Sequence, residues 1–327
     1  MVGQSLAKLF LSRSADLYEH YGMKPRIVAC VDNLGSAITP EGLDLQRLLD
    51  VKKAKGSVGE YSKSQKFNAI QVIENVEAEI LIECSPTNLD SGEPGTSHII
   101  SAMRTGKNVI SVNKGPLALA FPSLIELANY NGVMLRFSGT VGGGTPILEF
   151  AKRCLKGDRI VSFRGILNGT TNYILSKMED GLTYQAALAD ASRMGYAESN
   201  PSLDVDGFDA AAKLVIMANW IMSMKVTMKN VQRTGIAEIK LKDVKKAVSH
   251  HKAVKLIASC DGKSLKVSPS TVLKNDPICV NGTLNGVTFE SEHSGSQTII
   301  GKGAGGMETA SSILRDMIEI RDTVFER

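Results

Sequence analysis

Asp209 and Lys213 are the residue pair best placed to do chemistry, because they lie four positions apart on a helix predicted over 208–224. Side chains at this spacing share one face of a helix. The other positions are apolar nearly all round, which is typical of a buried helix. A buried charge is costly unless it is paired, and paired ionisable groups facing a cleft are candidates for a functional site. A solvated surface ion pair is the alternative.

The segment before this helix is acidic and contains Gly and Pro, which predicts a loop. Its pattern from Ala191 to Lys213 is A-x3-G-Y-A-x2-N-P-x2-D-V-x-G-x-D-x3-K. This run resembles the signature of the homoserine dehydrogenase family. The signature is long and gapped, and the resemblance extends over most of the chain.

The resemblance implies an NAD(P)-dependent interconversion of L-aspartate 4-semialdehyde and L-homoserine, in threonine, methionine and isoleucine biosynthesis. It implies the short form of the family, without an aspartokinase or a C-terminal regulatory module. Lys213 would exchange the proton of the reacting oxygen, Asp209 would orient Lys213, and Lys114 would flank the same oxygen. The residues expected to bind the substrate are Glu198, Asp204, Tyr196, Gly169 and Thr170.

Strands and helices alternate through the first part of the chain. Strands are predicted at 26–31, 78–84, 108–112 and 133–137, and helices at 41–53, 69–75, 96–105 and 123–131. Such alternation favours an α/β fold with a doubly wound, Rossmann-type parallel sheet. Ligands of these sheets bind at the carboxyl ends of the strands.

The start of the chain departs from the usual dinucleotide-binding pattern, in which a strand and G-x-G-x-x-G precede the first helix. Here a helix begins at once, and Gly3 stands where the third glycine is expected. Val2 and Gly3 would meet the cofactor pyrophosphate at the helix N-terminus. Either the recorded start lies about 10–15 residues late, a length that would hold the strand and turn, or the chain binds cofactor poorly. We favour the first, and expect a gap in the sheet without that strand.

Further positions are predicted to contact the cofactor. Asp32 follows a strand, where an acidic residue can bond a ribose 2′-hydroxyl and favours NAD over NADP; a turn aspartate before Gly35 is the alternative. By the resemblance, Cys84, Ser85 and Lys114 lie on the nicotinamide side, and Gly303 comes close to the cofactor. For Lys114 alone, an exposed loop lysine is the alternative.

The densest glycine stretch, 138–146, is not a P-loop, since no Gly-Lys-Ser/Thr follows. The family's equivalent segment resembles a hinge and in some members offers backbone carbonyls to a monovalent cation. Val141, Gly143 and Thr145 are the matching positions. Ser138 stands where the family often has Glu, and this departure from the family pattern argues against the cation site.

The rest of the chain predicts an α+β domain with a largely antiparallel sheet. Strands are expected at 160–167, 255–260, 265–272, 286–290 and 297–300, and helices over 169–178, 184–194, 241–253 and 308–324. The N–H groups that begin the helix at Gly169 suit a carboxylate, a role compatible with Thr170 as a capping residue. An open sheet often finds a partner across a two-fold axis, and the resemblance likewise implies a homodimer.

These elements predict a nucleotide-binding domain over 1–137 that lacks its first strand. A substrate-binding and dimerisation domain follows over 138–300, and a C-terminal helix over 301–327 returns to the nucleotide domain.

Composition excludes several classes of protein. The net charge of +4 is small and dispersed, so no nucleic-acid partner is expected. No apolar run reaches membrane-span length and no signal sequence is recognisable, which favours a cytoplasmic location. Five cysteines without zinc-ligand spacing fit reduced thiols. A cofactor-free binding or regulatory protein, or a reductase of another small amino-acid aldehyde, remains an alternative function.

Overall fold

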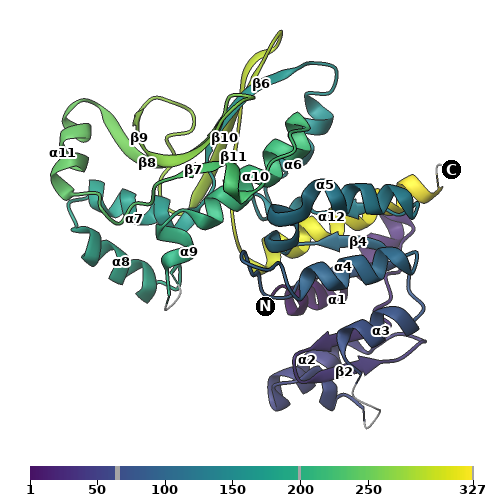
Figure 1. Ribbon diagram of the computed structural model, residues 1–327. Coiled ribbons are helices and arrows are strands. Elements are labelled where there is room, and N and C mark those ends of the chain that lie inside the picture. Colours follow the sequence, from purple (N-terminus) through teal and green to yellow (C-terminus); the bar gives the residue numbers. More distant parts are fainter. Residues whose placement is uncertain (63–66, 198–199, 326–327) are drawn as a thin grey trace. The chain divides into compact units, whose positions relative to one another are not determined.

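The structure is a computed structural model that describes residues 1–62, 67–197 and 200–325, and it divides into two compact units (Figure 1). Unit 1 comprises Met1–Pro116, Ser123–Gly139 and Gly306–Arg327, and unit 2 comprises Leu117–Pro122 and Thr140–Gly305. The functions predicted for the domains remain predictions. No helix among the described residues is both long enough and apolar enough to cross a membrane.

Unit 1 contains a parallel three-stranded sheet in the order β3 (Ile80–Glu83), β4 (Asn108–Ser111), β5 (Leu135–Arg136). Helix α4 (Gly95–Arg104) connects the first two strands, and α5 (Lys114–Tyr130) connects the last two. Helix α3 (Ala69–Asn75) precedes β3 and has the bounds predicted from the sequence. This Rossmann-type α/β arrangement confirms the predicted fold class, and the carboxyl ends of β3 and β4 lead directly into residues 84–85 and 113–114.

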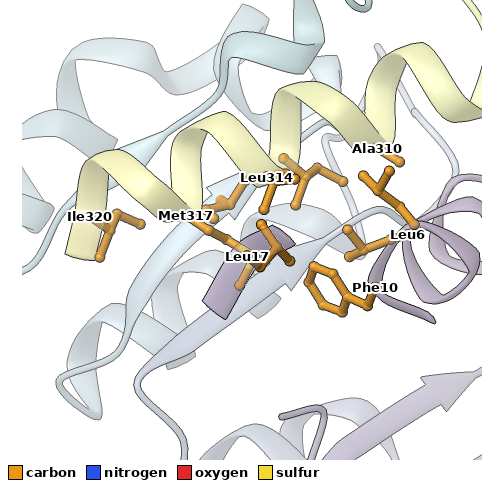
Figure 2. Packing of buried hydrophobic residues seen from close by; sticks show 10 residues of the cluster. Leu6, Phe10, Leu17, Ala310, Leu314, Met317 and Ile320 are labelled. Atoms are coloured by element: carbon orange, nitrogen blue, oxygen red, sulfur yellow. The ribbon is translucent and has the colours of Figure 1, made fainter. Parts of the chain in front are cut away.

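Two long helices far apart in the sequence, α1 (Val2–Tyr21) and α12 (Gly306–Phe325), share one hydrophobic core (Figure 2). Apolar residues recur at helical spacing on each, which gives each helix one apolar face. The α1 face carries Leu6, Phe10 and Leu17, and the α12 face carries Ala310, Leu314, Met317 and Ile320. Ile80 and Ile82 of β3 pack against this cluster, as the two-residue period of a strand requires. The start of α1 is therefore held beside the sheet.

The strand predicted at 26–31 does not join the parallel sheet. It is β1 (Ala29–Asp32), which pairs antiparallel with β2 (Gly35–Ile38) in a separate two-stranded sheet. The expected gap is therefore present in the described part of unit 1, because no pairing links β1 to β3. Helix α2 (Leu45–Lys55) and a 3-10 turn at Val58–Glu60 cover this hairpin with a small apolar cluster of their own.

Helix α5 corrects a further prediction. After the strand at 108–112 the next helix was predicted only from 123, but α5 already begins at Lys114. Asn113 caps it, since its side chain accepts a hydrogen bond from the N–H of Gly115 at 3.0 Å. The helix is kinked at Ala120, close to Pro122. Proline lacks a backbone N–H, so it is common in the first turn of a helix and disfavoured in its interior. Pro122 therefore indicated a helix that starts at this point.

Unit 2 is built on a six-stranded sheet in the order β11-β10-β6-β8-β9-β7. The bounds are β6 (Ile160–Ile166), β7 (Val231–Arg233), β8 (Lys252–Cys260), β9 (Leu265–Leu273), β10 (Leu284–Ser291) and β11 (Gly295–Lys302). All pairs are antiparallel except β7 with β9. The predicted, largely antiparallel sheet is confirmed, and β7 is an additional short strand.

The helices of unit 2 are α6 (Ile147–Glu149), α7 (Gly169–Glu179), α8 (Tyr184–Arg193), α9 (Ser202–Val205), α10 (Phe208–Met222) and α11 (Leu241–Ser249), with a π-helical turn at Phe150–Cys154. Helix α10 is buried from Ala210 to Asn219, which confirms the prediction. It ends at Ser223, in the left-handed conformation. Helix α9 lies in the segment that was expected to be entirely loop.

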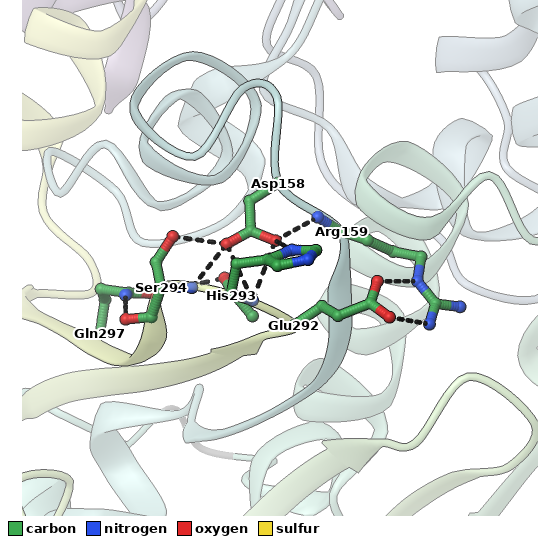
Figure 3. A network of polar contacts seen from close by, with 7 residues as sticks. Asp158, Arg159, Glu292, His293, Ser294 and Gln297 are labelled. Atoms are coloured by element: carbon green, nitrogen blue, oxygen red, sulfur yellow. Dashed lines mark hydrogen bonds and ion pairs between the residues drawn. The ribbon is translucent and has the colours of Figure 1, made fainter.

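A polar network fixes the β10–β11 hairpin to the start of β6 (Figure 3). The carboxylate of Asp158 accepts hydrogen bonds from the hydroxyl and N–H of Ser294, from His293 and from the N–H of Arg159. These bonds, that from the Ser294 hydroxyl first, hold the pKa of Asp158 well below its usual range. Beside it, Arg159 and Glu292 form an ion pair at 2.7 Å. The network lies on the surface and shapes the hairpin.

Candidate active site

The Lys213–Asp209 pair is buried. The Lys213 Nζ lies 2.7 Å from an Asp209 carboxylate oxygen, and the two side chains are 8% and 14% exposed. The same Nζ donates a hydrogen bond to the carbonyl of Leu167, also at 2.7 Å. Because α10 is buried from Ala210 to Asn219, the pair is largely shielded from water. The surface ion-pair alternative is therefore excluded.

Asn168 connects this pair to a second carboxylate, and sequence reasoning gave it no role. Its Nδ2 donates to Asp204 at 2.6 Å and to Asp209 at 2.9 Å. Its Oδ1 accepts from the N–H of Thr171 at 2.8 Å, which makes Asn168 the N-cap of α7. An asparagine between a strand and a helix signals a cap, but not which side chains the amide nitrogen will meet.

Asp204, on α9, belongs to the same site, and its pKa is raised. Burial is the main cause, and the negative charge of Asp209 adds to it. The hydrogen bond from Asn168 and the charge of Lys213 oppose the shift only in part. Two carboxylates thus stand against one ammonium group, an arrangement that favours a bound cation such as a substrate ammonium.

The N-terminus of α7 brings the other predicted substrate residues to the same place. The Thr170 hydroxyl donates to the carbonyl of Tyr196 at 2.8 Å, and the Tyr196 ring meets Tyr173 edge-on at 4.9 Å. Gly169 has no room for a side chain, since a Cβ there would lie 2.7 Å from the carbonyl of Thr283. Glu198 lies outside the described residues.

The cofactor positions predicted in unit 1 gather at the carboxyl end of the parallel sheet. A Cβ on Gly3 would lie 3.7 Å from the Cys84 sulfur, so the first turn of α1, which begins at Val2, is beside the end of β3. The Ser85 hydroxyl accepts from the Asn113 amide at 3.2 Å, next to Lys114. Helix N–H groups and an ammonium are donors that suit a dinucleotide, so this set fits the predicted cofactor.

Glu83, at the end of β3, is a buried carboxylate that sequence reasoning also left without a role. It is 3% exposed and lies 2.7 Å from the His98 ring. Burial alone would raise its pKa, but the hydrogen bonds from His98 and Ser85 lower it. Glu83 therefore remains charged while it holds the segment that carries Ser85.

Asp32 is engaged by its own turn. Its carboxylate accepts from the N–H groups of Leu34 and Gly35, from Ser57 and Val58, and from the Lys52 ammonium at 2.7 Å. Burial would raise its pKa, but these bonds together lower it to about 2. The geometry supports the turn alternative, and the ribose contact remains a prediction.

The glycine-rich loop packs against the end of β11 within unit 2. The Thr145 hydroxyl donates to the carbonyl of Lys302 at 3.1 Å, and a Cβ on Gly143 would lie 3.0 Å from the Gly303 carbonyl carbon. The Thr145 carbonyl already accepts from the N–H of Ile147 at 2.8 Å. Val141 is fully buried. The cation role of these carbonyls remains a prediction, and the described residues contain no cluster of three or more His, Cys, Asp or Glu that could hold a metal.

A Rossmann-type unit, joined to an antiparallel-sheet unit that buries a lysine against Asp209, is typical of an α/β oxidoreductase. A family model described as homoserine dehydrogenase matches residues 146–318. A model for glutamate/leucine/phenylalanine/valine dehydrogenases matches a shorter stretch, 13–93. The chain belongs to the homoserine dehydrogenase family.

Individual relatives support this assignment over nearly the whole chain. A homoserine dehydrogenase of Methanocaldococcus jannaschii is 41% identical over 98% of this chain and 95% of its own length. An NAD(+)-dependent homoserine dehydrogenase of Pseudomonas canavaninivorans is 37% identical over 98% of this chain and 94% of its own. The crystal structure of a putative homoserine dehydrogenase from Archaeoglobus fulgidus is 38% identical, with a TM-score of 0.90 over 98% of this chain and 96% of that one.

Proposed function

We propose that this protein interconverts L-aspartate 4-semialdehyde and L-homoserine with NAD or NADP, in the biosynthesis of threonine, methionine and isoleucine. The observation that carries the proposal is the buried Lys213–Asp209 pair, joined to Asp204 through Asn168. A reducible aldehyde needs a proton or a fixed positive charge where its oxygen becomes an alkoxide. It also needs its ammonium and carboxylate groups held in one orientation.

Bound NAD or NADP supplies and accepts the hydride. Both kinds of cofactor occur among the relatives: the Pseudomonas canavaninivorans protein is NAD(+)-dependent, and a hyperthermophilic archaeal homoserine dehydrogenase with a TM-score of 0.85 and 26% identity was solved with NADPH. In this chain the first turn of α1 at Val2 and Gly3, together with Ser85 and Lys114, would hold it.

Lys213 is the group that exchanges a proton with the reacting oxygen. An ammonium has three N–H donors; two are used by Asp209 and Leu167, so one remains for a ligand as far as the described residues show. Asp209 fixes the direction of the ammonium and balances its charge. Lys114 keeps the role that the resemblance predicts for it, a second positive charge at the reacting oxygen.

The substrate's own charges have matching groups in unit 2. Asp204 binds the ammonium group, together with Glu198. The N–H groups of α7 at Gly169 and Thr170 receive the carboxylate, since the positive end of the helix dipole faces them. Tyr196 closes the pocket beside them.

Steady-state kinetics test this function. The purified protein should oxidise L-homoserine with NAD⁺ or NADP⁺ and should reduce L-aspartate 4-semialdehyde with the reduced cofactors. A panel of other small amino-acid aldehydes should react more slowly, with kcat/KM lower by about 10-fold or more, the scale of one extra or missing methylene. Failure to bind NADH in a fluorescence titration would contradict the proposal and favour a cofactor-free role.

The assembly and location belong to the same proposal. We propose a homodimer formed through the sheet of unit 2, of which β11 is an edge strand, in a cytoplasmic enzyme that binds neither nucleic acid nor membrane. Sedimentation equilibrium should give about twice the 35.1 kDa mass of one chain. A concentration-independent monomer would contradict it. Addition of K⁺ or Na⁺ tests the cation proposal for Val141, Gly143 and Thr145.

A further inference from the structure

One amide nitrogen in unit 2 holds two carboxylates. The Asn168 Nδ2 lies 2.6 Å from Asp204 and 2.9 Å from Asp209, and the residue is only 4% exposed. Its Oδ1 accepts from the N–H of Thr171 at 2.8 Å. Because the oxygen accepts from this backbone donor, the nitrogen must face the carboxylates, and the amide orientation follows from the network.

We infer that Asn168 is a positioning residue, whose amide holds Asp209 on Lys213 while it holds Asp204 for the substrate ammonium. The inference rests on the proposed function. Asn168 itself touches no reacting atom in this account. It acts through the two aspartates, which come from different helices, α9 and α10.

Asparagine is suited to this position by its donor set. Two carboxylates that share a site repel each other, and Lys213 offers only one positive charge to both. The amide NH₂ has two N–H donors, one for each carboxylate, and carries no charge. Serine has one donor and aspartate has none. The position must also cap α7, which asparagine, aspartate and serine all do well.

The decisive variant is Asn168→Asp. It keeps the cap and nearly the same shape, but it replaces both donors with an acceptor that faces Asp204, Asp209 and Lys213. We expect kcat to fall by about 10²-fold, the scale of misplacing an acid–base group, and the homoserine KM to rise by about 10-fold. The acidic limb of the pH profile of kcat/KM should move to higher pH, because three carboxylates then share one ammonium. The NADH Kd should not change.

Two further variants separate positioning from folding. Asn168→Ser keeps the cap and one donor, so it should lose less activity than Asn168→Asp. Thr183→Asp is the matched control: Thr183 caps α8 in the same unit by accepting from the N–H of Ala186, and it is exposed. That variant adds a carboxylate at another helix N-terminus without removing a donor to Asp204 or Asp209, and its activity should stay within about twofold of the unaltered protein.

The possible outcomes are distinguishable. An unaltered protein without activity on homoserine overturns the proposed function, and the inference with it. Activity in the unaltered protein, together with near-normal kcat, KM and pH profile in Asn168→Asp, overturns the inference alone. If Asn168→Asp does not fold, Asn168→Ser decides: near-normal kcat, KM and pH profile in this variant would contradict a positioning role.

Discussion

The Lys213 amine is held in one direction by two protein groups. Its Nζ has the Asp209 carboxylate and the Leu167 carbonyl at 2.7 Å each. An ammonium fixed in this way can act on a developing alkoxide without first reorganising water. The side chain therefore combines the two properties that the proposed reaction needs, a proton and a fixed direction.

The variant Lys213→Ala should lower kcat by about 10²-fold or more, the usual scale for loss of an acid–base group. The matched control is Lys229→Ala, in the same unit but exposed, which should leave turnover unchanged. Steady-state kinetics with L-homoserine measure both. Near-normal turnover in Lys213→Ala would refute the assignment of this residue as the proton donor and acceptor.

Asp204 links function to pH-dependent stability. Burial and the charge of Asp209 raise its pKa above the ordinary 3.8, so the folded protein binds this proton more tightly than the unfolded chain does. Stability is then lost as pH rises from 3.8 through the raised pKa. Asp204→Asn should melt at higher temperature than the unaltered protein at pH 7, and the difference should shrink towards pH 4.

The same variant should raise the homoserine KM by about 10- to 100-fold, the loss of a charged hydrogen bond. Thermal melts over a pH series and kinetics at pH 7 measure the two effects separately. A melting temperature that is lower at neutral pH would show that the Asp204 charge is compensated, contrary to the direction of its pKa.

At the scale of elements, glycines at the end of β11 are required by packing. A Cβ on Gly303 would lie 2.1 Å from the Asn285 amide nitrogen, and one on Gly301 would lie 2.1 Å from the Thr145 hydroxyl. Gly303→Ala should therefore lower the free energy of unfolding by about 1–3 kcal/mol through overpacking, with or without cofactor. Denaturant titration measures this. An unchanged stability would mean that Asn285 moves aside at little cost.

The sequence predicted elements well where one physical signal dominated. The apolar surface of α10 and its Asp209–Lys213 spacing predicted the buried pair. Asp204 and Tyr196 of the long signature are hydrogen-bonded to Asn168 and Thr170 beside that pair, and their role in substrate binding stays a prediction. Asn168 was missed because its importance depends on two distant carboxylates. The start of α5 at Lys114 was missed because a proline inside the helix resembled a boundary.

Pairing of strands was harder to predict than their existence. A strand was predicted at 26–31 and a gap in the sheet was expected, but the pairing of β1 with Gly35–Ile38, a segment with no strong strand pattern, was not predicted. Hydrogen-bond partners depend on which strand is nearest, and a local pattern carries no such information. The short β7 was missed for the same reason, since it is stabilised by pairing with β9.

At the scale of the whole molecule, cofactor binding should stabilise the protein by mass action. NADH at about 100 times its Kd should add about 2.7 kcal/mol to the free energy of unfolding. The melting temperature should rise by several degrees. Gly3→Ala is the informative comparison, because its Cβ would make only an ordinary 3.7 Å contact with Cys84. It should melt normally alone yet gain less from NADH. An equal gain would place the cofactor phosphates away from Gly3.

The β1–β2 hairpin should unfold locally at a lower free energy than the rest of unit 1. Two strands that pair only with each other are marginal in water, and they rest on a small cluster around Ala37, Leu48 and Tyr61. Amides of residues 29–38 should exchange with deuterium well before those of β4, whose Val109 and Ile110 are fully buried. Mass spectrometry of peptic fragments would resolve the two rates. On warming, the hairpin would then unfold locally first, while the parallel sheet that leads into Ser85 and Lys114 stays folded.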